Sequence, residues 1–486
     1  MAAPAMPRIL VLGGGLTGLS AAYELAPAAA AGRVQVTLLE SADRPGGKVE
    51  TARPEGLVIE QGPDSFLATP GKPWARDLCR DLGLEGELVA TPPVGRRSFV
   101  YHAGRLHPLP AGVVTGMPSR LGPFLATRLL TPAGKARALL DLVLPRVLPP
   151  DGSDVALGRL LRARLGPEVV DRLVEPLLSG IYAADADRLS LDATFPNLRR
   201  QEAQHRSLIL GAMAEARRAR CARAAAGATA PPPPPFLTLR QGLATLVDAL
   251  AARLRATPGV ELRTGAEVHA LERSARGGYT VRLAGEEVHA DAVVIALPAP
   301  QAARVLADAA PDAARELGGV AYADVALVAF AFDRAAVAHR MAGSGFVVPR
   351  RADIAVTACT WVSAKWPESA PPDTALLRVY LGRAGEHVLE RDDHDLVTTA
   401  RAALRRSMRI EAEPRLVRVM RVPQGLPQYA VGHLARVERI EAALSHLPAV
   451  WATGSAFRGV GMPDCVRQGR EAAEAALAWA SSAAPR

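Results

Sequence analysis

The glycine-rich run GGGLTG at residues 13–18 constrains this chain more than any other feature. It follows the short apolar run 8–12, which is typical of a buried parallel strand, and it precedes a segment with helical spacing. In such a G-x-G-x-x-G pattern Gly13 permits a tight turn, Gly15 admits a pyrophosphate, and Gly18 lets the helix pack on the strand. The free N–H groups that begin the helix would then face the phosphates. The sequence therefore predicts a dinucleotide-binding unit.

Two features after the glycine run narrow the choice of dinucleotide. Glu40 ends the second apolar strand, where a carboxylate accepts hydrogen bonds from ribose hydroxyls and disfavours a 2′-phosphate, which argues against NADP. A second glycine pair follows at once in the segment RPGGK, residues 44–48. It predicts a second close approach of backbone to phosphate, with a cation nearby. The doublet resembles that of FAD-dependent amine oxidases, phytoene desaturases and porphyrinogen oxidases and is absent from plain NAD dehydrogenases, and this resemblance implies FAD rather than NAD.

Composition excludes several classes of protein. With 486 residues, 49% of them hydrophobic, the chain can form about three domains around large cores. Aromatic residues make up only 4%, and no run of five basic residues occurs, so we expect no nucleic-acid partner. The net charge of +9 is carried almost entirely by arginine and is interpreted mainly as a compositional bias. It would still favour an anionic substrate or an acidic membrane surface.

The cysteine spacing and the lengths of the apolar segments indicate in which compartment the protein is expected. The four cysteines are far apart and include no C-x-x-C pair, so neither a disulfide framework nor a metal site is expected. The N-terminus has no signal-peptide pattern, and no apolar stretch is long enough to span a bilayer. We expect a cytoplasmic protein. The amphipathic residues 108–150 leave two interpretations open: helices that cap a core, or a surface that lies peripherally on the inner face of the cell membrane.

Apolar strands that end in glycine or proline occur at both ends of the chain and in its middle. This distribution predicts a dinucleotide domain built from discontinuous segments. The expected organisation is 1–90, first FAD-binding part; 91–210, helical substrate or membrane region; 211–235, low-complexity loop with extended polyproline; 236–300, second FAD-binding part; 301–435, substrate domain; and 436–486, third FAD-binding part.

Four further motifs follow in order along the chain. They are EQGPDSF at 60–66, EPLLSGIYA at 175–183, PQY with a later GH at 427–433, and GVGMPDC at 459–465. Flavin amine oxidases and phytoene desaturases share the glycine doublet but not this set. From about residue 8 to 476 the chain resembles the oxygen-dependent, FAD-containing protoporphyrinogen oxidase family. Coproporphyrinogen III oxidases of the coproporphyrin-forming type are close relatives with the same motifs.

The resemblance implies a fold and a cofactor. The fold would combine α/β and α+β parts in an amine-oxidase-like architecture: a discontinuous Rossmann-like FAD domain, a mixed-sheet substrate domain and a helical domain that could associate with a membrane. The cofactor would be non-covalent FAD. The residues implied to contact it are Gly13, Gly14, Gly15, Leu16, Thr17 and Gly18 at the pyrophosphate, Glu40 and Ser41 at the ribose, Gly46, Gly47 and Lys48 in the doublet, Gly62, Pro63, Asp64 and Ser65 beside the flavin ring, Val268 at the adenine, and Val460, Gly461 and Met462 at the pyrimidine end.

Fewer residues can be assigned to the substrate. The resemblance implies an arginine on a substrate propionate in the segment 95–101, where Arg97 is our first choice and Arg96 the second; both could instead be solvated surface residues. Gly180 resembles the glycine whose carbonyl faces the tetrapyrrole. Asp464 is expected to cap the closing helix rather than to act in catalysis. His433 is expected to be packed and hydrogen-bonded beside the cofactor.

No side chain is predicted to be catalytic, because the flavin would carry the chemistry. The resemblance implies oxidation of protoporphyrinogen IX in three rounds of hydride transfer, with dioxygen as acceptor and hydrogen peroxide as product. Coproporphyrinogen III is the alternative substrate. More distant alternatives are a flavin amine oxidase or carotenoid desaturase, in which Cys465 could tether the flavin, and an inactive flavin-binding protein. A homodimer and transfer of the porphyrin to a metal chelatase are further expectations.

Overall fold

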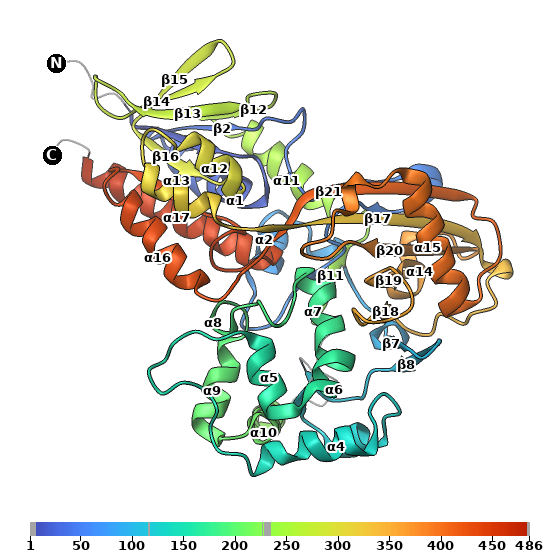
Figure 1. The fold of residues 1–486 in the computed structure, drawn as a ribbon. Helices are drawn as coiled ribbons and strands as arrows, with labels where there is room; N and C mark the ends of the chain where they lie inside the picture. The colour runs from blue at the N-terminus through green and yellow to red at the C-terminus, as the bar shows by residue number, and fades with distance from the viewer. Residues whose placement is uncertain (1–5, 115–116, 226, 228–234, 484–486) are drawn as a thin grey trace.

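The computed structural model describes residues 6–114, 117–225, 227 and 235–483. Figure 1 shows three parts: a nucleotide-binding unit at the upper left with both chain ends, a sheet unit at the right, and a helical unit below. Segments far apart in the sequence build the first of these. This arrangement is the discontinuous, amine-oxidase-like α/β fold that the sequence predicts.

A five-stranded parallel sheet organises the nucleotide-binding unit. Its order is β12-β2-β1-β16-β22. The strands are β1 (Arg8–Leu12), β2 (Gln35–Leu39), β12 (Val260–Arg263), β16 (Ala292–Ile295) and β22 (Val450–Ala452). Strand β16 is buried along its whole length because parallel neighbours flank it and helices cover both faces.

Helices cover the two faces of this sheet. Along β1, Ile9 and Val11 point into one core while Leu10 and Leu12 point into the other, as the two-residue period of a strand requires. One face is covered by α1 (Leu16–Ala30), α2 (Trp74–Asp81), α11 (Ala244–Arg255) and α17 (Met462–Ala483). The other is covered by α12 (Ala299–Val305), α13 (Pro311–Gly318) and α16 (His433–Leu444).

Small sheets extend this unit. One is an antiparallel meander of β13 (Val268–Arg273), β14 (Tyr279–Leu283) and β15 (Glu286–Ala290). In the other, β11 (Phe236–Leu239) lies between β5 (Phe66–Leu67) and β6 (Leu88–Ala90). A short pair is β3 (Thr51–Ala52) with β4 (Ile59–Glu60). Another short pair, β9 (Val113–Val114) with β10 (Met117–Pro118), lies against the helical unit.

A seven-stranded mixed sheet forms the second unit, in the order β21-β17-β20-β19-β18-β7-β8. The strands are β7 (Ser98–His102), β8 (Arg105–Pro108), β17 (Tyr322–Asp333), β18 (Gly345–Val347), β19 (Ala358–Trp361), β20 (Thr374–Leu381) and β21 (Leu416–Pro427), with helices α14 (Val362–Lys365) and α15 (Asp393–Met408). The prediction that residues 91–210 are helical is wrong for 98–108. Residues 98–102 form β7, which pairs with the distant strand β18, and residues 105–108 form β8, which pairs with β7.

The helical unit contains α3 (Leu121–Ala126), α4 (Pro132–Leu139), α5 (Leu157–Leu165), α6 (Pro167–Val169), α7 (Glu175–Tyr182), α8 (Leu191–Thr194), α9 (Pro196–His205) and α10 (Leu208–Ala225). The interpretation of 211–235 as a loop is wrong for residues 211–225. These residues continue α10, because alanine and arginine are strong helix formers even without an apolar face. Of the predicted polyproline segment 231–235, residues 231–234 lie outside the described residues.

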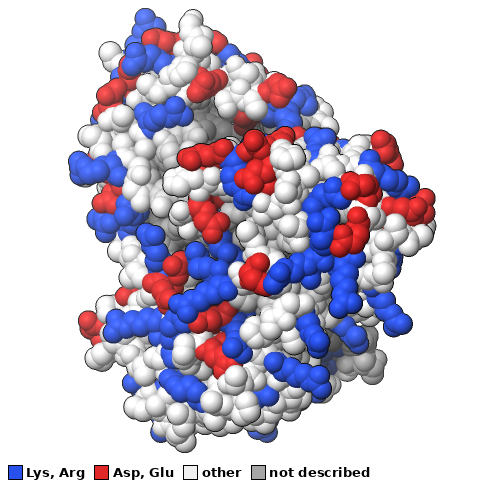
Figure 2. Space-filling view, turned by 45° about the vertical axis from the view of Figure 1, so that its right-hand side comes forward, with Lys and Arg blue, Asp and Glu red and all other residues white. Residues whose placement is uncertain are grey.

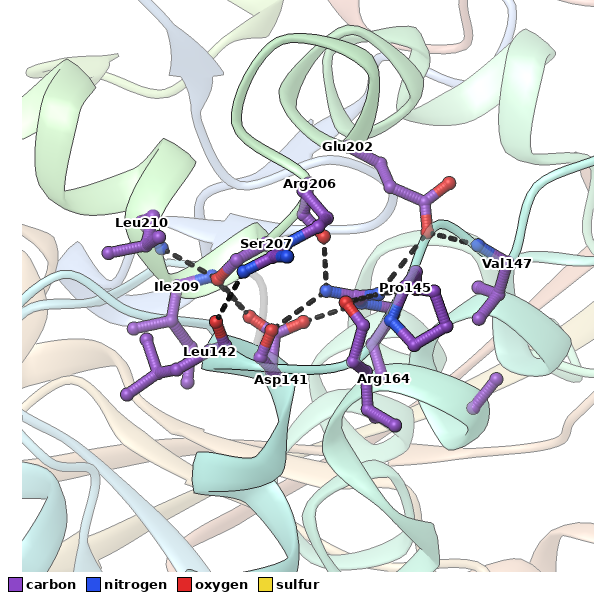
Figure 3. A network of polar contacts seen from close by, with 12 residues as sticks. Asp141, Leu142, Pro145, Val147, Arg164, Glu202, Arg206, Ser207, Ile209 and Leu210 are labelled. Carbon is purple, nitrogen blue, oxygen red and sulfur yellow. Dashed lines mark hydrogen bonds and ion pairs between the residues drawn. The ribbon is translucent and has the colours of Figure 1, made fainter.

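A buried arginine joins several elements of the helical unit (Figure 3). Arg164 of α5 has no exposed side-chain surface, and its Nε donates to Oδ1 of Asp141 at 2.6 Å. The second oxygen of Asp141 accepts hydrogen bonds from Ser207 Oγ at 2.5 Å and from the N–H of Ile209 at 2.9 Å. The arginine also donates to the carbonyls of Pro145 and Arg206. One ion pair thus joins α5 to the start of α10.

Some apolar side chains of the segment 108–150 remain on the surface. The structure describes no helix that is both long enough and apolar enough to cross a bilayer. Leu125, Leu140, Val143 and Val147 are exposed, whereas Phe124 and Leu129 are buried in the helical core. Residues 108–150 therefore cap a core, as one interpretation requires, and attachment to a membrane surface stays a prediction.

Candidate cofactor and substrate site

The two glycine segments meet at the carboxyl end of the parallel sheet. The N–H of Gly46 donates to the carbonyl of Gly14 at 2.7 Å, and residues 15 and 46 form an isolated parallel bridge. A Cβ atom on Gly47 would lie 3.3 Å from the Cα of Gly15. Gly46 has φ +112°, and a Cβ there would lie 2.8 Å from Cγ1 of Val247, so the doublet needs glycine at this position for the two loops to meet.

Open space lies directly over Gly15. A Cβ atom there would meet no protein atom within 4 Å, although the residue is only half exposed. Gly15 is the N-cap of α1 and no side chain caps this helix, so the N–H groups of the first turn are free for a ligand. At Gly18, by contrast, a Cβ would lie 1.9 Å from the carbonyl oxygen of Gly13. The space over Gly15 and the first-turn N–H groups of α1 would suit a pyrophosphate, and the contact of these two glycines with one stays a prediction.

Glu40 is held beside this cradle. It is 9% exposed, and its carboxylate accepts the N–H of Gly14 at 2.7 Å and the N–H of Ala42 at 2.8 Å. Ser41 Oγ contacts the same group at 3.3 Å. A carboxylate has about four lone-pair sites, so it can still accept ribose hydroxyls. The segment leading to Val268 lies alongside, since the N–H of Ala266 donates to the carbonyl of Glu40 at 2.8 Å.

Asp64, in the loop predicted to border the flavin ring, is the centre of a buried charge cluster. It forms an ion pair with Lys365 of α14 at 2.8 Å and lies 3.8 Å from Arg378 of β20. Burial opposes its charge, but the two cations outweigh burial and hold the pKa of Asp64 well below its usual range. Arg378 also donates to the carbonyl of Gly62 at 3.1 Å. The loop 62–65, which includes Pro63 and Ser65, is thereby fixed to the seven-stranded sheet.

Lys48 reaches across the site to the other unit. Its ammonium donates hydrogen bonds to the backbone carbonyls of two residues of β21. These are Gln424 and Gly425, and the distance to the second is 3.2 Å. Burial lowers the pKa of Lys48 to about 8, against the opposing effect of Cys465 and Asp324. The predicted doublet cation therefore lies between the glycine loops and the seven-stranded sheet.

An aromatic pair supports the C-terminal loop. The Tyr429 hydroxyl donates to the carbonyl of Ser455 at 2.6 Å and accepts the N–H of Gly459 at 2.9 Å. His433 stacks on this ring with centroids 4.0 Å apart, and its Nε2 lies 2.9 Å from the carbonyl oxygen of Phe457. The prediction that His433 is packed and hydrogen-bonded is confirmed. The structural role of Tyr429 was missed, because nothing local indicates which loop its hydroxyl reaches.

The predicted pyrimidine-end residues lie where the C-terminal loop enters α17. Val460 and Gly461 precede the helix, and Met462 is its first residue. The prediction that Asp464 precedes and caps the helix is wrong: the residue lies inside the first turn, and its carboxylate forms an ion pair with Lys72 at 2.5 Å. Burial raises the pKa of the neighbouring Cys465 thiol to about 11.

The predicted substrate residues come from two elements. Arg96 and Arg97 are both exposed. The Nε of Arg96 donates to the carbonyl of Thr91 at 3.3 Å. The backbone carbonyl of Arg97 accepts the N–H of Ser344 at 2.7 Å. Gly180 is exposed on α7, where a Cβ would lie 3.8 Å from Cγ1 of Val347. At Gly180, α7 therefore lies within van der Waals distance of β18. The choice between the arginines stays a prediction.

Comparison with known proteins identifies what this arrangement is similar to. The sequence profile described as flavin-containing amine oxidoreductase matches residues 16–477. The chain is 40% identical to the coproporphyrinogen III oxidase of Bacillus subtilis, over 97% of this chain and 98% of the relative. It is 31% identical to the protoporphyrinogen oxidase of Bos taurus, over 96% and 98% of the two chains.

Solved structures show the same likeness. The crystal structure of a putative protoporphyrinogen oxidase from Exiguobacterium sp. 255-15 aligns with a TM-score of 0.82 and 35% identity, covering 97% of this chain and 99% of that one. A putrescine oxidase aligns with a TM-score of 0.65 at 16% identity, covering 98% and 99%, which shows a shared fold alone.

Proposed function

Because this chain belongs to the flavin-containing amine oxidoreductase family, we propose that it oxidises a porphyrinogen to a porphyrin and that its preferred substrate is coproporphyrinogen III. The observation that carries the proposal is 40% identity to a coproporphyrinogen III oxidase along 97% of the chain. Protoporphyrinogen IX, the first expectation from sequence, becomes the second candidate, because relatives that bear that activity in their names are 31% and 30% identical.

The residues present fit the cofactor of the family, FAD. The cradle over Gly15, the free N–H groups of α1 and the Glu40 carboxylate suit a pyrophosphate and a ribose. When bound, FAD supplies an acceptor for hydride equivalents and passes electrons to dioxygen. No side-chain base is needed for that chemistry, so the protein has to position the substrate and exclude water.

The chain's own residues account for that positioning. The Asp64–Lys365 ion pair holds the loop 62–65 against the seven-stranded sheet, and Tyr429 holds the C-terminal loop. Gly180 is exposed on α7, and the resemblance assigns its carbonyl to the tetrapyrrole. Arginines near it would bind substrate carboxylates through paired hydrogen bonds. Dioxygen as acceptor, a homodimer, a membrane surface and a chelatase partner belong to the proposal only as predictions.

Turnover of the two porphyrinogens tests the proposal. We expect kcat/KM for coproporphyrinogen III to exceed that for protoporphyrinogen IX by at least about tenfold, because the tetra-acid offers two more carboxylates and even one further charge-assisted hydrogen bond contributes about 1.5–3 kcal/mol. Porphyrin fluorescence gives the rate, and heat-inactivated protein gives the rate of spontaneous oxidation. A preference for protoporphyrinogen IX would reverse the order of the two candidates, and oxidation of neither would refute the proposal.

A further inference from the structure

One face of the seven-stranded sheet is turned toward the nucleotide-binding unit. Helix α15 covers the opposite face, since its Leu404 shares a core with Val379 of β20. The near face meets the nucleotide-binding unit, since Leu376 of β20 shares a core with Ile59 of β4. Side chains alternate along a strand, so Tyr380 points to the same face as Leu376, and it is only half-buried. A half-buried tyrosine on an inner strand that faces another unit borders space that the protein does not fill.

Segments predicted to contact the substrate and the flavin lie on both sides of Tyr380. The tyrosine is opposite Ala358 of β19, and Ala358 is opposite Val347 of β18. Opposite residues of antiparallel strands share a face, so Val347 lies about 10 Å from Tyr380 on this face, at two strand spacings. Val347 is also the side chain nearest to Gly180 of α7. On the other side of β20, again two strands away, Lys48 binds carbonyls of β21.

A buried arginine joins Tyr380 to the loop predicted to border the flavin ring. Figure 2 shows acidic and basic side chains interspersed over one face of the molecule, whereas Arg378 is only 3% exposed. Its Nη1 donates to the carbonyls of Glu60 at 2.7 Å and Gly62 at 3.1 Å. Its Nε donates to the Tyr380 hydroxyl at 3.0 Å, and its Nη2 donates to the same oxygen. One planar guanidinium therefore fixes the tyrosine relative to the loop.

Neutralising a carboxylate does not account for this arginine. Asp64 lies 3.8 Å from Nη2 of Arg378, but it already has a closer ion pair with Lys365 at 2.8 Å. The Glu60 carboxylate is directed elsewhere, since it accepts the N–H of Leu243 at the start of α11 at 2.7 Å. Arg378 contacts Glu60 through the backbone carbonyl instead. The distinctive contacts of Arg378 are therefore its hydrogen bonds to the loop and to Tyr380.

The hydroxyl of Tyr380 is fully used by the protein. Its oxygen accepts two N–H groups of Arg378, so its own proton is left to donate to Oγ1 of Thr360, 3.1 Å away on β19. The guanidinium also lies 4.8 Å from the centroid of the tyrosine ring. Because the hydroxyl is held from two sides, the side chain offers a ligand an apolar ring surface of defined orientation.

We propose that the ring of Tyr380 contacts the tetrapyrrole, and that Arg378 is a positioning residue that orients this ring relative to the loop 62–65 and hence the substrate relative to the flavin. This inference rests on the proposed function, because it names the surface on which the porphyrinogen lies. Tyr380 binds the apolar ring system by packing. Hydride transfer depends steeply on placement, and a shift of about 1 Å lowers a rate about a hundredfold.

Arg378→Lys tests the positioning role. Lysine keeps a cation beside Asp64, but one ammonium cannot hold the tyrosine and both loop carbonyls at once. We expect kcat per bound flavin to fall about tenfold or more, while KM for coproporphyrinogen III changes less than about threefold. A merely structural role would lower stability or flavin content and leave kcat per bound flavin unchanged. The control is Arg401→Lys on α15, at the opposite face, where the arginine pairs with the exposed Glu413; it should change none of these values.

Tyr380→Phe is a milder probe of the same contact. It removes only the oxygen that Arg378 binds, so it should show a similar fall in kcat per bound flavin, and it keeps the test decisive if Arg378→Lys does not fold. Because the ring remains, coproporphyrin III should bind this variant nearly as well as the unchanged protein.

Equilibrium binding of coproporphyrin III separates this inference from the proposed function. Tyr380→Ala should bind the porphyrin about tenfold more weakly, because the apolar surface of the ring is lost. Porphyrin fluorescence follows the titration, and flavin absorbance per folded chain shows that the cofactor is retained. If the protein oxidised neither porphyrinogen, the proposed function would fail while this titration still judged Tyr380. Unchanged porphyrin binding by Tyr380→Ala, or unchanged kcat per bound flavin in Tyr380→Phe, would overturn the inference.

Discussion

Replacing Gly15 by alanine should yield a folded protein that has lost most of its FAD. The new methyl group meets no protein atom within 4 Å, and the residue has φ −67° and ψ 176°, values that alanine adopts readily. It would, however, occupy the space assigned to the pyrophosphate. Overpacking of this kind costs about 1–3 kcal/mol, which corresponds to about a tenfold to hundredfold weaker Kd. Flavin absorbance per folded chain and titration with added FAD measure the effect.

Two further glycine variants serve as controls. Gly18→Ala should lose both flavin and stability, because its Cβ would overlap the carbonyl oxygen of Gly13 at 1.9 Å. Gly122→Ala, on α3, also meets open space but lies in the helical unit, and it should keep full flavin content. Full flavin content in Gly15→Ala would show that the space over this residue does not receive the cofactor.

Replacing Arg164 by methionine should destabilise the helical unit by about 3–5 kcal/mol. The substitution leaves Asp141 buried without its counter-charge, and neither side chain has any exposed surface in the unchanged protein. It also removes the donor that holds the carbonyls of Pro145 and Arg206. Because the chain has several units, hydrogen exchange in α5 and α10 is a better measure than a single unfolding midpoint.

The matched control is Arg315→Met, which removes an arginine from an exposed ion pair with Asp312. Both partners are about three-quarters exposed, with side-chain values of 74% and 75%, so exchange rates should not change measurably. If hydrogen exchange in α5 were as slow in Arg164→Met as in the control, the buried Arg164–Asp141 ion pair would not be what links α5 to the start of α10.

Local patterns were sufficient to predict the strand–helix–strand unit that brings the glycine turn next to Glu40. Residues 13–18 and Glu40 lie within one strand–helix–strand unit, so spacing alone indicates that they converge. The partners of Asp64 could not be found in this way, because Lys365 is 301 positions distant and only the tertiary fold brings it to the loop. The same holds for Tyr429, whose hydroxyl joins two turns of a loop 26 to 30 residues further along the chain.

The fold was predictable to a similar extent. Apolar strands near both ends and in the middle of the sequence indicated a discontinuous sheet, and β1, β16 and β22 lie side by side as expected. Residues 98–108 were misassigned because the strand that β7 joins, β18, begins at residue 345, far beyond any local window. The extent of α10 was missed because a uniform alanine–arginine segment shows no apolar periodicity, although its helix propensity is high.

An absorption spectrum of the purified protein, recorded without oxygen before and after addition of coproporphyrinogen III, tests the central claim most directly. The account predicts flavin bands that fade on addition and return when air is admitted, with FAD released into the supernatant by acid. A folded protein that stays colourless in the presence of FAD, or whose flavin bands remain unchanged by both porphyrinogens, would contradict it.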